Sequence, residues 1–121
     1  VSSDPANMNY LSGYDAHSFY MPQCLLIHIN EEEPICFVRE QDAGGAFIKT
    51  YLNEKNIIKY SEKYIHTPPA HPYEFLVKVI KDRKWDNLSI GLEKDCHYFT
   101  ATCCEKIVNG LPNAKIKDAE F

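Results

Sequence analysis

The residues best suited to chemistry lie between Tyr14 and Met21, where aromatic rings alternate with polar groups. The candidates for contact with a ligand are Tyr14, His17, Phe19, Tyr20 and Met21. Large rings with a few polar tips are typical of a wall that binds a small molecule. The alternative is that the rings belong to the core, since aromatic side chains are mostly structural. The sequence therefore predicts either a ligand-facing wall or a buried cluster here.

No familiar catalytic or metal-binding pattern accompanies this stretch. The sequence has no Gly-x-Ser-x-Gly, Cys-x-x-Cys or His-Glu-x-x-His motif. His66 and His71 stand on either side of two prolines, with no carboxylate or cysteine nearby to complete a metal site, although they could line a polar pocket. The scattered acidic residues give no sign of convergence: Asp15, Asp42, Glu93 and Asp95. We therefore assign no catalytic residue and no metal ligand to these residues.

Two elements must position the aromatic stretch. Asp4 and Pro5 predict the start of a short helix, which Ser12 and Gly13 end. Beyond the stretch, residues 21–29 and 34–38 predict two strands, joined by a polar turn at residues 30–33. The aromatic stretch is thus expected between a capped helix and a buried strand.

The remaining sequence alternates between helix and strand signals. Asp42 predicts a cap for a helix from Ala43, in which Gly44 and Gly45 predict close packing. Val1–Ser3 resembles the tail of a strand whose body lies upstream. Further elements are expected as follows: strands at 56–60, 88–92 and, at a sheet edge, 114–117; a loop at 61–71; and helices from Pro72 and over 99–109. The pattern predicts one α/β domain over residues 1–121, with a mixed sheet and three or four helices.

The helix at 99–109 leaves two details open. Its cap is either Thr100 or Thr102, the latter forming a capping box with Glu105. Gly110 is expected in the left-handed position after the helix. The inward face is expected to carry Ala101, Cys104, Val108 and Leu111.

Composition excludes two classes of partner and suggests a compartment. The 121 residues carry a net charge of −4, so no basic face is available for nucleic acid. No apolar run approaches the roughly 20 residues that span a membrane. The five cysteines fit reduced thiols in a cytoplasmic protein better than a disulfide framework. The first residue is Val, and we expect the sequence to be part of a longer one.

Several motifs in order resemble the N-terminal domain of the creatinase/prolidase/aminopeptidase P superfamily. Its Asn-Ile/Met-x-Tyr-Leu-Ser/Thr-Gly signature matches residues 7–13, its Ile-Gly-x-Glu strand matches 90–93, and its Leu-Pro-x-Ala ending matches 111–114. Within the superfamily, the runs at 13–24, 41–46 and 71–76 are most similar to ectoine hydrolases. The resemblance covers nearly the whole chain.

The resemblance implies a fold for this domain and a separate domain for catalysis. It implies a ribonuclease-H-like mixed β-sheet flanked by helices, with its first strand truncated here. Catalysis would belong to a C-terminal pita-bread domain absent from this chain, which in the peptidases binds two divalent metal ions. The domain itself is expected to hold no cofactor and to be inactive alone. It would support a homodimer and reach into the partner subunit's active site.

The resemblance also suggests which residues meet the substrate. In creatinase-like relatives, a phenylalanine and an arginine two residues apart contact the substrate, and these positions fall on Phe19 and Met21. Because Met21 lacks the guanidinium fork that would hold the carboxylate, creatine is disfavoured. A compact cyclic amidine acid such as ectoine would suit Tyr14, His17, Phe19 and Tyr20.

Two other functions stay open at this point. The first is the N-terminal domain of an Xaa-Pro dipeptidase or aminopeptidase, whose substrate is a dipeptide rather than a small amide. The second is a non-enzymatic interaction module, since the same fold has been recruited for protein binding.

Overall fold

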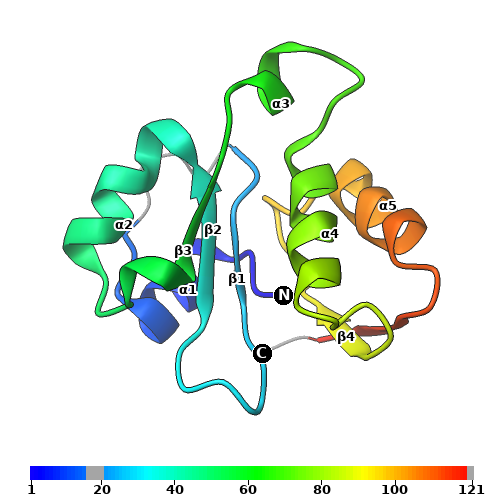
Figure 1. Cartoon of the computed structure of the whole chain (residues 1–121), viewed down its shortest axis with the longest axis horizontal. Coiled ribbons are helices and arrows are strands. Elements are labelled where there is room, and N and C mark those ends of the chain that lie inside the picture. Colours follow the sequence, from blue (N-terminus) through cyan, green and yellow to red (C-terminus); the bar gives the residue numbers. More distant parts are fainter. Residues whose placement is uncertain (16–20, 120–121) are drawn as a thin grey trace.

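The computed structural model describes residues 1–15 and 21–119. Figure 1 shows the strands β1 (Cys24–Leu26), β2 (Ile35–Arg39) and β3 (Ile57–Tyr60) at the centre. The helices α1 (Pro5–Ser12) and α2 (Ala43–Lys49) lie on one side of them, and α4 (Pro72–Asp82) and α5 (Ala101–Gly110) on the other. The predicted α/β fold, with a mixed sheet flanked by helices, is confirmed. The elements are α1 (Pro5–Ser12), β1 (Cys24–Leu26), β2 (Ile35–Arg39), η1 (Glu40–Asp42), α2 (Ala43–Lys49), η2 (Glu54–Asn56), β3 (Ile57–Tyr60), α3 (Lys63–His66), α4 (Pro72–Asp82), β4 (Ser89–Leu92), α5 (Ala101–Gly110) and β5 (Lys115–Asp118).

The strands form two ladders that residues 1–3 connect. β1 pairs antiparallel with β2, which pairs parallel with β3, and β4 pairs parallel with β5. Ser2 exchanges two backbone hydrogen bonds with Leu25 of β1, at 2.9 and 2.8 Å. On its other side, the Val1 nitrogen donates to the Gly91 carbonyl of β4 at 2.7 Å. Backbone hydrogen bonding therefore continues from one ladder to the other, with residues 1–3 in strand geometry as predicted.

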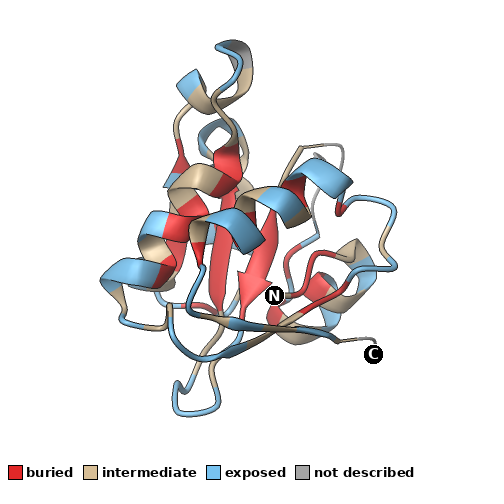
Figure 2. Cartoon of the chain, turned by 90° about the vertical axis from the view of Figure 1, so that its right-hand side faces the viewer, coloured by how far each residue is buried: buried red, intermediate tan, exposed pale blue. Residues whose placement is uncertain are grey.

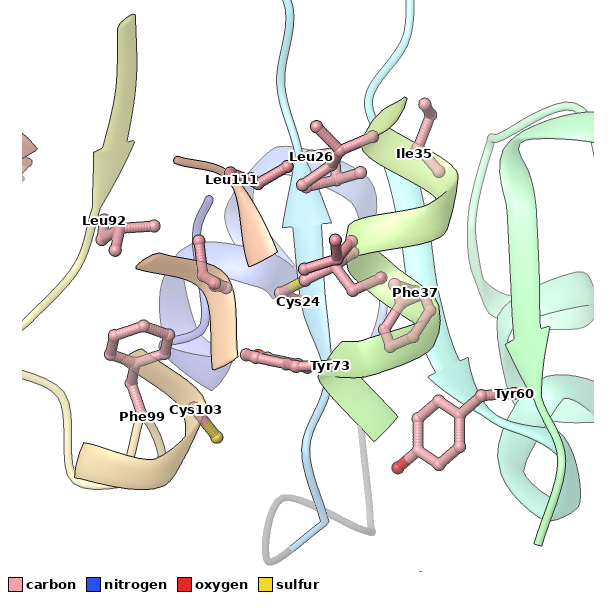
Figure 3. Close-up of a cluster of buried hydrophobic side chains, with 14 residues drawn as sticks. Cys24, Leu26, Ile35, Phe37, Tyr60, Tyr73, Leu92, Phe99, Cys103 and Leu111 are labelled. Atoms are coloured by element: carbon pink, nitrogen blue, oxygen red, sulfur yellow. The ribbon is translucent and has the colours of Figure 1, made fainter. Parts of the chain in front are cut away.

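Both faces of the central strands are buried, which explains their unbroken apolar sequence. Cys24 and Phe37 point toward α4 and α5, whereas Leu25 and Cys36 point toward α1 and α2. In Figure 2 the central strands are buried, whereas β4, β5 and the outward-facing turns of the helices are mostly intermediate or exposed. Figure 3 shows the larger cluster, in which Tyr73 lies near Phe37. The chain thus has one apolar layer on each side of its sheet.

Capping side chains and one glycine explain where three helices begin or end. The Asp4 carboxylate accepts from the amides of Ala6 and Asn7, and Gly13 ends α1 at φ 80°. The α5 cap is Thr100, whose hydroxyl accepts from the Cys103 amide, so the Thr102 alternative is wrong. The α4 cap, which the sequence did not reveal, is His71: its Nδ1 accepts from the Tyr73 amide. A histidine ring nitrogen here replaces the usual short oxygen side chain.

Other sequence expectations are corrected by the structure. β1 covers only Cys24–Leu26 of the predicted strand at 21–29, and the predicted loop contains the short helix α3. Asp42 makes no side-chain capping bond to α2. Gly44 and Gly45 do not permit close packing, because a Cβ at either would meet no atom within 4 Å.

The buried face of α5 also differs from the prediction. Leu111 is buried as predicted, but Ala101 and Val108 are exposed, and the buried residues within the helix are Cys103 and Ile107. Gly110 is the last helical residue and lacks positive φ. Its missing side chain instead admits Val77, whose Cγ2 would lie 2.7 Å from a Cβ. Close contact between α4 and α5, rather than a left-handed turn, therefore requires this glycine.

The cysteines are free thiols, in agreement with the prediction of no disulfide framework. Burial raises the pKa of Cys24 and of Cys36 to about 12, so both stay protonated at neutral pH. Among the described residues, none of the helices has the length and apolar character needed to cross a membrane.

Candidate functional site

Two polar clusters fix the chain on either side of the aromatic stretch. The first, the Glu93 cluster, consists of Ser2, Ser3, Asp4, Asn7 and Glu93. The Glu93 carboxylate is only 5% exposed, at the end of β4. It accepts from four donors: the Ser2 hydroxyl at 3.1 Å, the Ser3 amide at 2.6 Å, the Asp4 amide at 2.9 Å and the Asn7 side chain at 2.8 Å.

This cluster explains two of the sequence motifs physically. Asn7 belongs to the signature at 7–13 and Glu93 ends the motif at 90–93, and the two side chains bind each other. Because a buried carboxylate needs hydrogen-bond donors, its four partners fix the start of α1 against β4. The helix that precedes the aromatic stretch therefore has a defined position.

The second cluster lies where β2 and β3 end and β1 begins. This sheet-end cluster comprises Tyr14, Pro22, Gln23, Arg39, Asp42, Tyr60 and Glu62. The buried Tyr60 donates its hydroxyl to the Pro22 carbonyl at 2.7 Å, and Tyr73 donates to the Gln23 carbonyl at 3.3 Å. In Figure 3 the Tyr60 hydroxyl points away from the other labelled side chains. The chain that follows the aromatic stretch is therefore fixed by two tyrosines.

Charged groups surround the Tyr60 hydroxyl. Arg39, next to Tyr60 in the ladder, makes a bidentate ion pair with Glu62 at 2.8 Å for both bonds. Burial, with Asp42 and Glu62 contributing, raises the pKa of Tyr60, although Arg39 opposes the shift. The hydroxyl thus stays protonated and remains a donor.

Tyr14, which the sequence predicted as a ligand contact, lies in the core. It is 2% exposed and packs with Met8, Leu25 and Val38 between the sheet and the two helices α1 and α2. Burial, followed by the effect of Cys36 and Asp42, raises its pKa. In the described chain its ring anchors the start of the aromatic stretch.

The other predicted contacts are only partly described. Met21 is half-buried, whereas His17, Phe19 and Tyr20 lie outside the described residues. Their role as ligand contacts stays a prediction. What the structure supplies is the position of the two ends: Tyr14 in the core and Pro22 held by Tyr60.

The sheet-end cluster contains polar atoms that lack partners. Within the described part of the chain, Gln23 Nε2 and Asp42 Oδ2 are buried without any hydrogen bond. The Glu93 cluster has no such atom among the residues described. Unpartnered buried groups are rare in folded proteins and are concentrated where a ligand, water or another chain completes the site.

His71 and Cys103 form a third polar contact, at the start of α4. The His71 Nε2 lies 3.9 Å from the Cys103 sulfur, which also accepts from the Thr100 hydroxyl at 3.3 Å. Cys103 is 1% exposed, so its thiol is closed to reagents. Among described residues no group of three or more His, Cys, Asp or Glu could hold a metal ion.

Sequence reasoning missed the tyrosines and the buried carboxylate. Tyr60 and Tyr73 lie in a strand and a helix that were predicted, but hydroxyl partners are not visible in a pattern. Glu93 was read as an isolated acid, although its place at the end of an apolar strand was a usable signal of burial. The acidic residues named in the sequence do not gather: Glu93 binds the start of α1, and Asp42 lies near Tyr14 and Tyr60.

The chain is similar in sequence to known hydrolases. The chain is 38% identical over 120 residues to ectoine hydrolase of Halomonas elongata, covering 98% of this chain and 30% of that protein. Two uncharacterized hydrolase/peptidases of Sinorhizobium fredii are 35% and 36% identical, over 100% and 98% of the chain. The chain spans about 30% of the length of these relatives.

The family model for the creatinase/prolidase N-terminal domain matches residues 1–120. That match covers the Glu93 cluster and the sheet-end cluster alike. The chain therefore belongs to the creatinase/prolidase N-terminal domain family.

Proposed function

We propose that this chain is the non-catalytic N-terminal domain of a C–N hydrolase similar to ectoine hydrolase. In the full-length protein it dimerises, and the stretch after Gly13 covers a substrate bound by a catalytic pita-bread domain. The proposal is supported by a relative named ectoine hydrolase that is 38% identical. Two divalent metal ions would belong to the catalytic domain, and the 121 residues alone would be inactive.

The observation that carries the proposal is the fixed position of both ends of the aromatic stretch. Tyr14 is buried, and the Pro22 carbonyl is held by the Tyr60 hydroxyl at 2.7 Å. A segment whose two ends are fixed can present its side chains with little loss of entropy on binding. The unpartnered atoms of Gln23 and Asp42 at the same end favour a site completed by something else.

The proposed substrate is a compact cyclic amidine acid. A delocalised amidinium placed over the Phe19 ring would gain about 0.5–2 kcal/mol from cation–π attraction. His17, Tyr20 and Met21 would form the rest of the cover, with neutral polar tips and no guanidinium. In our proposal the substrate lies at the boundary between two subunits.

The test is hydrolysis by the purified full-length protein, with ectoine and an Xaa-Pro dipeptide offered separately. We expect ectoine to be opened at a ring C–N bond and the dipeptide to be left intact. Cleavage of the dipeptide alone would overturn the choice of substrate. Turnover of neither, together with a stable complex with another protein, would contradict the enzyme and favour an interaction module.

The second candidate is the N-terminal domain of an Xaa-Pro dipeptidase. It is favoured by the two relatives named hydrolase/peptidase, which match the chain as completely as ectoine hydrolase does. The same pair of assays separates the two candidates, because the scissile C–N bond belongs to a cyclic amidine in one substrate and to a linear amide in the other.

A further inference from the structure

Two buried polar atoms of the sheet-end cluster have no hydrogen-bond partner among the described residues. They are Nε2 of Gln23, which is a donor, and Oδ2 of Asp42, which is an acceptor. Gln23 is only 5% exposed, so its amide is closed to bulk water. A buried polar group costs free energy unless its hydrogen bonds are completed. The two atoms therefore require an occupant that the described residues do not supply.

The register of β1 fixes the face on which the Gln23 side chain lies. Side chains alternate along a strand, and Cys24 belongs to the larger core cluster whereas Leu25 belongs to the smaller one. Gln23 directly precedes Cys24, so its side chain lies on the face of the smaller cluster. The antiparallel register, in which Cys24 pairs with Phe37, places Gln23 opposite Val38 when it is continued by one residue. The Gln23 amide therefore lies near the end of β2.

Asp42 reaches the same end of the same face. The chain runs from Val38 through the end of β2 and through η1 to Asp42, and the next residue, Ala43, is buried in the smaller cluster. Tyr14 belongs to that cluster as well. Burial raises the pKa of Tyr14 most, and Cys36 and Asp42 add to the shift, so the Asp42 carboxylate lies near this phenol. The two unpartnered atoms therefore share one corner of the smaller cluster.

The occupant of this corner must be small and must both donate and accept. Both atoms are shielded from the surface, so a bulky group cannot approach them from outside. A water molecule meets both requirements, since it accepts with its lone pairs and donates with its hydrogens. Buried waters typically make two to four hydrogen bonds to polar groups that otherwise lack partners, and a chain of 121 residues is expected to hold about four such waters.

We propose that one buried water molecule links the Gln23 amide to the Asp42 carboxylate. The water accepts from Gln23 Nε2 and donates to Asp42 Oδ2. Because Gln23 follows the aromatic stretch and Asp42 immediately precedes α2, the water fastens the end of the stretch to α2. It adds to the Tyr60 hydroxyl, which holds the neighbouring Pro22 carbonyl. The water site does not depend on the proposed function, since it needs no substrate and no second subunit.

A crystal structure of the full-length protein, at a resolution that shows ordered waters, tests the proposal directly. We expect a water oxygen at about 2.7–3.2 Å from both Gln23 Nε2 and Asp42 Oδ2. A direct hydrogen bond between the two side chains would overturn the proposal. A side chain from elsewhere in the protein at this place, or no ordered water within reach of both atoms, would overturn it too.

A double-mutant cycle tests the link in solution. Gln23→Met removes the amide at nearly constant length, and Asp42→Ala removes the carboxylate. If one water serves both groups, each single variant of the full-length protein already breaks the link. The fall in Tm of the double variant should then be smaller than the sum of the two single falls. Additive falls would contradict the shared water.

The control for the cycle is Gln41→Met, the same chemical change at an exposed position beside Asp42. Its effect on Tm should add to that of Asp42→Ala, because no shared water joins the two side chains. Equal coupling in both pairs would show that the coupling comes from Asp42 alone and would overturn the proposal. Should Gln23→Met fail to fold, the crystal structure of the unchanged protein still decides.

Discussion

The Glu93 cluster and the sheet-end cluster lie on either side of the aromatic stretch and differ in how completely they are paired. The Glu93 carboxylate has four donors within 3.1 Å. At the sheet end, Tyr60 holds the Pro22 carbonyl, but buried atoms of Gln23 and Asp42 have no partner among the described residues. One cluster is complete within the described residues and the other is not.

This difference in pairing suggests that the Glu93 cluster stabilises the fold, whereas the sheet-end cluster also serves function. A buried carboxylate whose hydrogen bonds are all made within the protein fixes local structure and needs no ligand to complete it. Buried polar atoms without partners cost free energy, and proteins retain them mainly where function or another chain supplies the partner. We therefore expect changes in the Glu93 cluster to act on stability, and changes at the sheet end to act on activity as well.

The largest stability effect should come from Glu93→Ala. It would leave four donors without their shared acceptor, and we expect the free energy of unfolding to fall by at least about 3 kcal/mol. Urea unfolding measures the change. Glu105→Ala, at an exposed position of α5, is the control and should stay within about 0.5 kcal/mol. Equal losses in the two variants would remove the distinction between the clusters.

The second effect concerns the turn that leads into the aromatic stretch. Gly13 has φ +80°, and a Cβ there would lie 3.0 Å from the Lys49 carbonyl oxygen. Gly13→Ala should therefore lower stability by about 1–2 kcal/mol. Gly44→Ala is its matched control, because open space surrounds that helical glycine, and it should raise stability by up to about 1 kcal/mol. Thermal unfolding of both variants shows whether the signs are opposite, as expected.

A smaller effect on stability is expected at the sheet end. Tyr60→Phe leaves the half-buried Pro22 carbonyl without its donor, which costs about 1 kcal/mol. In the full-length protein it should also reduce kcat/KM for the proposed substrate, because the end of the aromatic stretch is released. Tyr51→Phe is the control: its hydroxyl also holds a carbonyl, that of Leu11 at 2.5 Å, but Tyr51 is 64% exposed. If the two variants show equal kcat/KM, the sheet-end cluster only stabilises the fold, like the Glu93 cluster.

The smallest effect is a pH dependence at the cap of α4. Burial, with help from Lys106, lowers the pKa of His71 below 6.5, while Glu74 opposes the shift. The unfolded chain therefore binds the proton more readily, and stability falls as pH drops below about 6.5. His71→Asn keeps a capping side chain without titrating, so its unfolding free energy should fall less between about pH 7.5 and about pH 5.5. Parallel pH profiles of the two proteins would refute this.

Local signals predicted most of the fold. Asp4, Pro5 and Gly13 marked α1, and the apolar runs marked β2 and β3, because these features act within a few residues. The left-handed turn predicted at Gly110 was wrong because this glycine instead allows Val77 of α4 to approach, a contact between residues distant in the sequence. The same limit applies to the site. The Tyr60 hydroxyl meets Pro22 across 38 positions of sequence, and no pattern encodes that distance.

The most direct test of the central claim is kcat/KM of the full-length protein carrying Phe19→Ala, measured on ectoine, the proposed substrate, beside Tm. We expect kcat/KM to fall about tenfold or more, equivalent to about 1.4 kcal/mol of transition-state stabilisation, with Tm unchanged. Tyr10→Ala, at a position 89% exposed on α1, should change neither quantity. An unchanged kcat/KM in Phe19→Ala would contradict the claim that the aromatic stretch serves the reaction.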